Sequence, residues 1–171
     1  NIMCMNAPYR LYNFEGYVLY QLKDSTVSVD ELDNPERAAL INQCDIKNSI
    51  KKIINYEFRD DVGVDVAVLK VNGADVGIQH TFQISDDQFA TGNDRQLVNF
   101  KKYFFMAIAY AYNNYDPIDP KAGDFTGQRE PFLRGRKNCS GGSIKSITVI
   151  PHRPGPEAGG TEANSIYGDS P

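Results

Sequence analysis

The sequence predicts an α+β domain in which an antiparallel sheet with a central hairpin is packed by two helical segments. Three observations favour this fold: valines alternate along residues 62–68, isoleucines recur at helical spacing within residues 46–58, and helix-favouring residues fill 95–113. A period of two is typical of a strand, and a spacing of three or four residues is typical of a helix. Segments that each carry one apolar face are expected to pack on one another.

The first expected element is a strand over residues 17–22. Aromatic and β-branched residues dominate it, and the turn signal Lys23-Asp24-Ser25 follows. A helix is expected next, because residues 33–36 supply a capping residue, a proline in the first turn and an acid near the positive end of the helix dipole. Average helix lengths put this helix at about ten residues.

A further helical segment is expected within residues 46–58, completing a helical region over 34–58. Its apolar residues fall on one helix face, and lysines flank that face. The apolar residues are Ile46, Ile50, Ile53, Ile54 and Phe58, and the lysines are Lys47, Lys51 and Lys52. We interpret the lysines as a solvated outer edge, which is the usual state of surface charge.

The hairpin expected over residues 62–84 forms the centre of the predicted sheet. Alternating valines make its first strand, Asn72-Gly73 makes its turn, and a second alternating run makes its second strand. Asn-Gly between alternating runs is a strong hairpin signal. His80 is in phase with the apolar residues of the second strand, so its side chain is expected on the core side of the sheet.

A long helix over residues 95–113 is expected to pack against this sheet. Leu97, Phe100, Phe104, Ile108 and Ala111 recur at helical spacing, and the residues between them add helix propensity. Two prolines within residues 117–120 follow the predicted end of the helix, and a long loop continues from there through a basic segment. Residues 144–150 resume as a strand that a proline ends.

Length and composition predict one globular domain over residues 1–152 and a flexible Pro- and Gly-rich tail over residues 153–171. The chain has 171 residues, of which 41% are hydrophobic and 23% charged, as is typical of a soluble globular protein. Its longest apolar run, residues 103–112, is shorter than a membrane-spanning helix requires. A membrane is therefore not an expected partner.

The cysteines and histidines do not predict a metal site or a cofactor. Cys4, Cys44 and Cys139 form no Cys-x-x-Cys pair, and no histidine stands at metal-ligand spacing from them. Reduced thiols are the simplest interpretation of three widely spaced cysteines, which favours a reducing compartment or a virion as the location.

Charge is segregated along the chain. Residues 121–152 contain six Lys or Arg and two Asp or Glu, whereas residues 1–120 contain eleven and seventeen. The first region is therefore basic within a protein whose net charge is −4. An acidic protein does not coat nucleic acid or anionic membrane as a whole, so a polyanion would have to meet this local patch.

The loop in this basic region is the candidate anion-binding site. Guanidinium and ammonium groups, serine hydroxyls and glycine backbone amides all bind phosphate or carboxylate groups. The predicted binding residues are Arg129, Arg134, Arg136, Lys137, Ser140 and Lys145, and Gly135, Gly141 and Gly142 would allow close backbone approach. The alternative is a surface loop whose charges are solvated, or pair with the acidic body of its own chain or of a neighbouring copy.

Catalytic chemistry has weaker candidates in the sequence. His80 and His152 could act as general base and acid on a phosphodiester in a metal-independent nuclease. Asp65 and Lys70 fit a metal-dependent nuclease poorly, because residues of opposite parity on a regular strand point to opposite faces. No serine-hydrolase or zinc-hydrolase signature is present. Enzymatic activity is therefore not the favoured interpretation.

The sequence favours a non-enzymatic binding or assembly protein that uses the basic loop. A protein partner or self-association is the expected interaction. One alternative is a protein that binds single-stranded nucleic acid, in which early aromatic residues would stack bases beside the loop. The aromatic residues are Tyr9, Tyr12, Phe14, Tyr17 and Tyr20. The other alternative is the small nuclease, or another enzyme that acts on phosphate groups.

Overall fold

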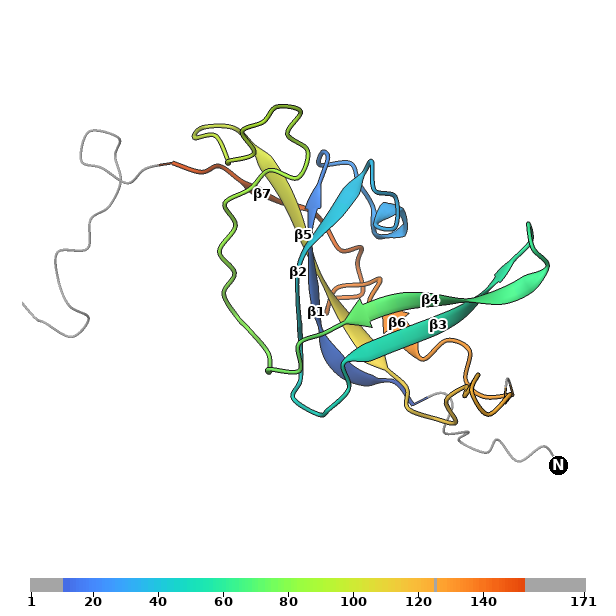
Figure 1. Cartoon of the computed structure of the whole chain (residues 1–171). Coiled ribbons are helices and arrows are strands. Elements are labelled where there is room, and N and C mark those ends of the chain that lie inside the picture. Colours follow the sequence, from blue (N-terminus) through green and yellow to red (C-terminus); the bar gives the residue numbers. More distant parts are fainter. Residues whose placement is uncertain (1–10, 125, 153–171) are drawn as a thin grey trace, which may run out of the picture.

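The computed structural model describes residues 11–124 and 126–152. Within them the chain forms seven β-strands and one three-residue 3-10 helix (Figure 1). The elements are β1 (Asn13–Leu22), η2 (Val29–Glu31), β2 (Ala38–Asp45), β3 (Lys52–Arg59), β4 (Val64–Asn72), β5 (Tyr103–Tyr112), β6 (Phe132–Arg134) and β7 (Ile147–Val149). No helix among these residues is long and apolar enough to cross a membrane. The predicted tail, residues 153–171, lies outside the described residues.

β1 and β5 form the centre of a five-stranded antiparallel sheet, called sheet A. β2 pairs with the edge of β1 that faces away from β5, and β6 and β7 pair with the edge of β5 that faces away from β1. Ile108 and Met106 of β5 lie opposite Val18 and Tyr20 of β1, and all four side chains are buried. This face of sheet A carries most of the hydrophobic core.

β3 and β4 form a separate antiparallel hairpin, called sheet B, which lies across sheet A and extends beyond it (Figure 1). At the near end Ile53 and Val71 lie opposite each other and are buried in the same core as β1 and β5. At the far end Gly63 has a φ of +69° and donates its N–H to the Arg59 carbonyl at 2.7 Å. Glycine adopts this left-handed backbone without strain, so it closes the turn.

Asn55 joins the two sheets. Its Oδ1 accepts a hydrogen bond from the Phe132 N–H at 2.9 Å, and its Nδ2 donates to the Phe132 carbonyl at 3.3 Å. Both residues are buried. The short strand β6 is thereby held between β5, through its ladder, and β3, through one side chain.

The prediction of an α+β fold is wrong. The chain forms two antiparallel sheets, and no helical segment packs on them in the part that the structure describes. The helix predicted over 95–113 is replaced by β5, in which bulky side chains alternate with Ala107, Ala109 and Ala111. The helical region predicted over 34–58 is replaced by β2 and β3, which take their hydrogen bonds from β1 and β4.

The predicted hairpin over 62–84 is half right. Its first strand exists as β4, but β4 pairs with β3, the strand that precedes it in the chain. Residues 76–84 form no strand. Gly73 does not have a left-handed backbone. A Cβ at this position would clash with Oδ2 of Asp45, so glycine is required here for the close approach of that carboxylate. His80 lies on this strandless segment and is exposed, which corrects its expected place on the core side.

Three other expectations are confirmed. The strand over residues 17–22 lies within β1, and the strand over 144–150 contains β7. The basic region between β5 and β7 is a long connection in which β6 is the one strand among the residues that the structure describes.

Candidate functional site

Arg134, at the end of β6, forms an ion pair with the acidic body of its own chain. Its Nη2 donates to Oδ1 of Asp33 at 2.6 Å and its Nη1 donates to Oδ2 at 3.2 Å. The guanidinium carbon lies 6.0 Å from the centre of the Tyr20 ring, and the side chain is 15% exposed. Hydrogen bonding from Arg134 lowers the pKa of Asp33. Arg134, which the sequence predicts for anion binding, is therefore held by a carboxylate of its own chain.

Arg129 and Arg136 also face carboxylates of the same chain. Arg129 Nη1 lies 2.8 Å from Oδ2 of Asp65 on β4, and the Arg129 carbonyl accepts a hydrogen bond from the Tyr56 N–H of β3 at 2.8 Å. Arg136 is only loosely paired, because its Nη2 lies 3.8 Å from Asp30 and both side chains are 77% exposed. Exposed pairs of this kind contribute little to stability.

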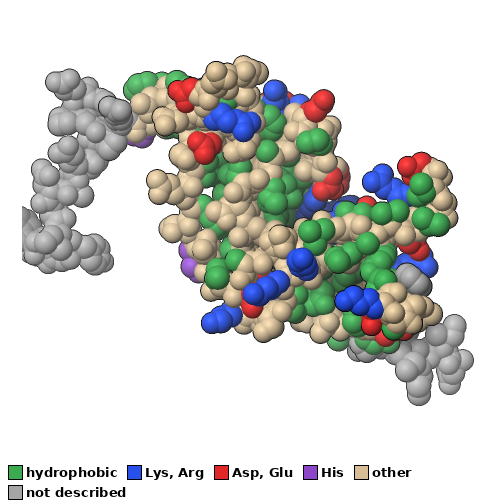
Figure 2. All heavy atoms as spheres, in the orientation of Figure 1, with side chains coloured by type: hydrophobic (Ala, Val, Ile, Leu, Met, Phe, Trp, Pro, Cys, Tyr) green, Lys and Arg blue, Asp and Glu red, His purple; other side chains and the backbone are tan. Residues whose placement is uncertain are grey.

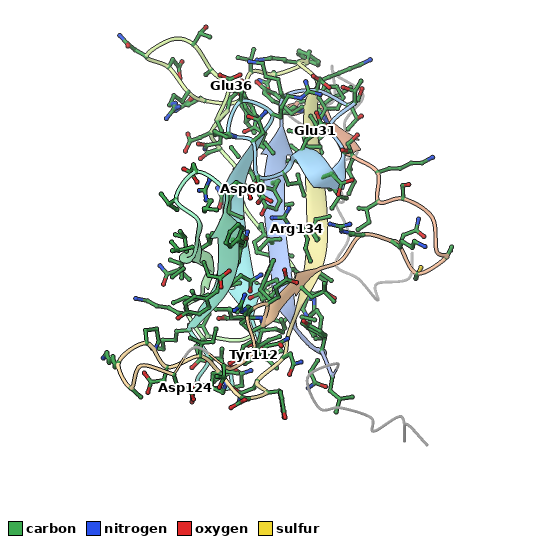
Figure 3. All side chains as sticks on the ribbon, turned by 90° about the vertical axis from the view of Figure 1, so that its right-hand side faces the viewer. Glu31, Glu36, Asp60, Tyr112, Asp124 and Arg134 are labelled. Atoms are coloured by element: carbon green, nitrogen blue, oxygen red, sulfur yellow. The ribbon has the colours of Figure 1, made fainter. Side chains whose placement is uncertain are left out.

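The segment between β6 and β7 leaves sheet A and returns to the same strand. β6 pairs with residues 110–112 of β5, and β7 pairs with residues 103–105. Residues 135–146, which we call the excursion loop, therefore project from one edge of β5 (Figure 3). The loop leaves sheet A after Gly135, whose N–H makes a hydrogen bond to β5, to the Ala109 carbonyl at 2.9 Å. The loop has both of its ends fixed on one rigid strand.

Asn138 closes the turn at the outer end of the excursion loop. Its Oδ1 accepts hydrogen bonds from the N–H groups of Ser140 at 3.0 Å and Gly142 at 2.9 Å, while its carbonyl accepts the N–H of Gly141 at 2.9 Å. Gly141 has a φ of +79°, which favours glycine. The backbone amides expected to approach an anion are thus already bound, those of Gly141 and Gly142 to Asn138 and that of Gly135 to Ala109 of β5. What the loop presents outward is its side chains.

The remaining predicted binding residues, Lys137, Ser140 and Lys145, are exposed on the excursion loop. Neither lysine forms an ion pair with any residue that the structure describes. The six predicted residues therefore divide into two groups. We call Arg129 and Arg134, which are bound to carboxylates, the base, and we call the residues on the exposed loop the tip. The tip residues are Arg136, Lys137, Ser140 and Lys145.

The two histidines proposed for catalysis are both exposed and lie on different segments. His80 follows β4, and His152 follows β7, where one ring nitrogen lies 3.3 Å from the Ile150 carbonyl. Figure 2 shows histidine side chains, in purple, at two separated points of the surface. Among the described residues no group of His, Cys, Asp and Glu could hold a metal ion. Asp65 and Lys70 each pair with another residue, Arg129 and Glu57 respectively.

A groove that no sequence pattern indicates lies between the hairpin and residues 127–130. It has a volume of about 750 Å³ and is open to solvent. We call it the aromatic groove; its lining residues are Tyr12, Tyr56, Glu57, Phe58, Asp65, Gly127, Gln128, Arg129 and Glu130. Figure 1 shows the connection from β5 to β6 passing beneath the hairpin at this point. Tyr12 belongs to the early aromatic cluster, but its neighbours in the groove are distant in sequence.

The rest of the early aromatic cluster is divided between the core and the surface of sheet A. Tyr20 is buried in the core, while Phe14 and Tyr17 contact each other on the opposite, partly open face of sheet A, with ring centres 5.0 Å apart. Tyr9 lies outside the described residues.

Comparison with known proteins gives this chain no relative: no family model, no curated protein and no solved structure matches it.

Proposed function

We propose that this protein is a non-enzymatic assembly module that uses the excursion loop to contact an acidic surface of another copy. The observation that carries the proposal is the division of the basic region. Arg129 and Arg134 are bound to carboxylates of their own chain, whereas Arg136, Lys137 and Lys145 are presented to solvent on a loop that is closed by Asn138. A preformed loop loses little conformational entropy when it binds, which favours association.

Charge supports a protein partner over nucleic acid. The chain carries a net charge of −4, so a second copy offers abundant carboxylates to the loop. Nucleic acid would be repelled by the acidic body, and affinity for phosphates depends on the number of neutralising side chains. The three basic side chains of the excursion loop are few for that purpose, and Arg129 and Arg134 are already paired with carboxylates.

The proposal is tested by measuring mass against protein concentration with light scattering. The variant Arg136→Ala/Lys137→Ala/Lys145→Ala removes the three charges of the excursion loop. The control Lys47→Ala/Lys51→Ala/Lys52→Ala removes three exposed lysines elsewhere and changes net charge equally. We expect the wild type and the control to associate at low salt, and high salt to dissociate them, because exposed charges are screened. The loop variant should stay monomeric.

Two results would oppose this function. If the wild type is a monomer at every concentration and salt level, the protein is not an assembly module of this kind. If the loop variant alone loses salt-sensitive retention on single-stranded DNA or RNA, and mass does not change, the loop binds nucleic acid instead.

A further inference from the structure

We propose that the aromatic groove is the acceptor site for the excursion loop of a second copy, binding its cationic side chains between aromatic rings and carboxylates. This inference rests on the proposed assembly function and names its second surface. The groove is lined by three aromatic rings and three carboxylates, against one guanidinium. A cation is the ligand that satisfies both kinds of group, since ring faces and carboxylates both attract positive charge.

The aromatic rings of the groove are accessible and partly fixed in place. The Tyr12 hydroxyl donates to the Glu130 carbonyl at 2.7 Å and accepts a hydrogen bond from Gln128 Nε2 at 3.1 Å. Burial, and then the nearby Glu130 carboxylate, raise the pKa of Tyr12, so this ring stays neutral. Phe58, on the other side, is 62% exposed. Rings that are already oriented bind a cation at a low cost in entropy.

The carboxylates of the groove are not equally engaged. Asp65 is paired with Arg129, and Glu57 is paired with Lys70. Glu130 forms no ion pair with any residue that the structure describes, and it is exposed at the rim. We therefore assign Glu130 the role of partner for the incoming ammonium or guanidinium group.

Donor and acceptor surfaces lie on different sides of the molecule. Figure 3 shows the excursion loop projecting on the right of sheet A, whereas the hairpin that forms the groove lies on the left. The contact is therefore made between copies and is heterologous: each copy uses its loop on one neighbour and its groove on another. Heterologous contacts that do not close into a ring produce open chains.

The test uses two complementary variants. The groove variant Phe58→Ser/Glu130→Gln removes an exposed ring and the unpaired carboxylate, and the loop variant is Arg136→Ala/Lys137→Ala/Lys145→Ala. A matched control, Val64→Ser/Glu36→Gln, removes an exposed apolar side chain of the same hairpin and an exposed carboxylate elsewhere. Circular dichroism and urea unfolding confirm that each variant is folded.

Neither the groove variant nor the loop variant should form assemblies alone, whereas the control should behave as the wild type. An equimolar mixture of the two should form heterodimers and nothing larger, because one intact loop meets one intact groove. If the groove variant associates as well as the wild type while the loop variant does not, the groove is not the acceptor, although the assembly function stands. If both associate as well as the wild type, assembly does not use the excursion loop, and both the proposed function and this inference are wrong.

A second measurement gives the affinity of a single loop–groove contact. The groove variant, which keeps the excursion loop, is titrated by calorimetry into the loop variant, which keeps its groove. We expect binding that weakens in high salt, and an affinity at least about tenfold lower when Phe58→Ser/Glu130→Gln is added, as loss of a cation–π contact with its carboxylate requires. Equal affinity with and without the groove substitutions overturns the inference.

Discussion

The base and the tip of the basic region contrast in what their charges contact. At the base, the Arg134 side chain is 15% exposed and forms two hydrogen bonds to Asp33. At the tip, Lys137 is exposed and forms no ion pair with a described residue. Both residues lie in one basic run of the sequence, yet only the first is adjacent to the sheet. A run of charge can therefore contain one part that stabilises the fold and another that is available to a partner.

The largest effect on the free energy of unfolding is expected at Asn55, which holds the strand that carries Arg134. Asn55→Ala removes both hydrogen bonds to the backbone of Phe132 and leaves a buried N–H and carbonyl without a partner. We expect the free energy of unfolding to fall by about 2–3 kcal/mol, the cost of unsatisfied buried polar groups. Urea unfolding measures it. A loss below about 0.5 kcal/mol would show that β6 is not held by Asn55.

A smaller effect is expected from the base arginine itself. Arg134→Met removes two hydrogen bonds and the contact with Tyr20, so it should cost about 1–2 kcal/mol. The matched control is Arg136→Met at the tip, whose 3.8 Å pair is exposed and should be worth less than about 0.5 kcal/mol. Equal losses in the two variants, measured by urea unfolding, would remove the distinction between base and tip.

The effect of Arg134→Met should also depend on pH. Arg134 lowers the pKa of Asp33 below its ordinary value of 3.8, so the folded state binds this proton less readily than the unfolded state. The stabilisation is present above that value and is lost as pH falls through the lower, folded pKa. The difference in unfolding free energy between wild type and Arg134→Met should therefore narrow at acid pH. A difference that is constant from neutral pH to about pH 2 would contradict the pairing.

An effect smaller than that of Arg134→Met is expected at Asn138. Asn138→Ala frees the N–H groups of Ser140 and Gly142, but both are exposed and can bind water, so the cost should be about 0.5–1 kcal/mol. Hydrogen exchange at these two amides should become faster, whereas exchange at Phe132 should not change. Unchanged exchange at Ser140 and Gly142 would mean that Asn138 does not close the loop.

Part of the fold could be predicted from the sequence. Aromatic and β-branched residues indicate the strand over 17–22 within β1, and alternating valines indicate β4. β5 also shows the period of two that is typical of a strand. From Met106 onward, Met106, Ile108 and Tyr110 alternate with alanines. That pattern competes with a helical spacing of the same residues, and pairing with β1 decides between them.

Other parts could not have been predicted from local patterns. β2 has a weak apolar pattern and exists as a strand because β1 supplies its hydrogen bonds. The pairing of Arg134 with Asp33 joins residues that are 101 positions apart, so no spacing rule indicates it. The aromatic groove likewise combines the start of β1, the hairpin and residues 127–130. The sequence located the basic charge, and the tertiary structure decided which part of it is engaged.

The central claim is that base and tip have separate roles, and it is tested most directly by measuring two quantities on two variants. Unfolding free energy and association constant are determined for Arg134→Met and for Arg136→Ala/Lys137→Ala/Lys145→Ala under the same conditions. We predict a crossed result: Arg134→Met lowers stability and retains association, whereas the loop variant retains stability and loses association. If the loop variant loses stability, or if Arg134→Met abolishes association while still folded, the division between base and tip is wrong.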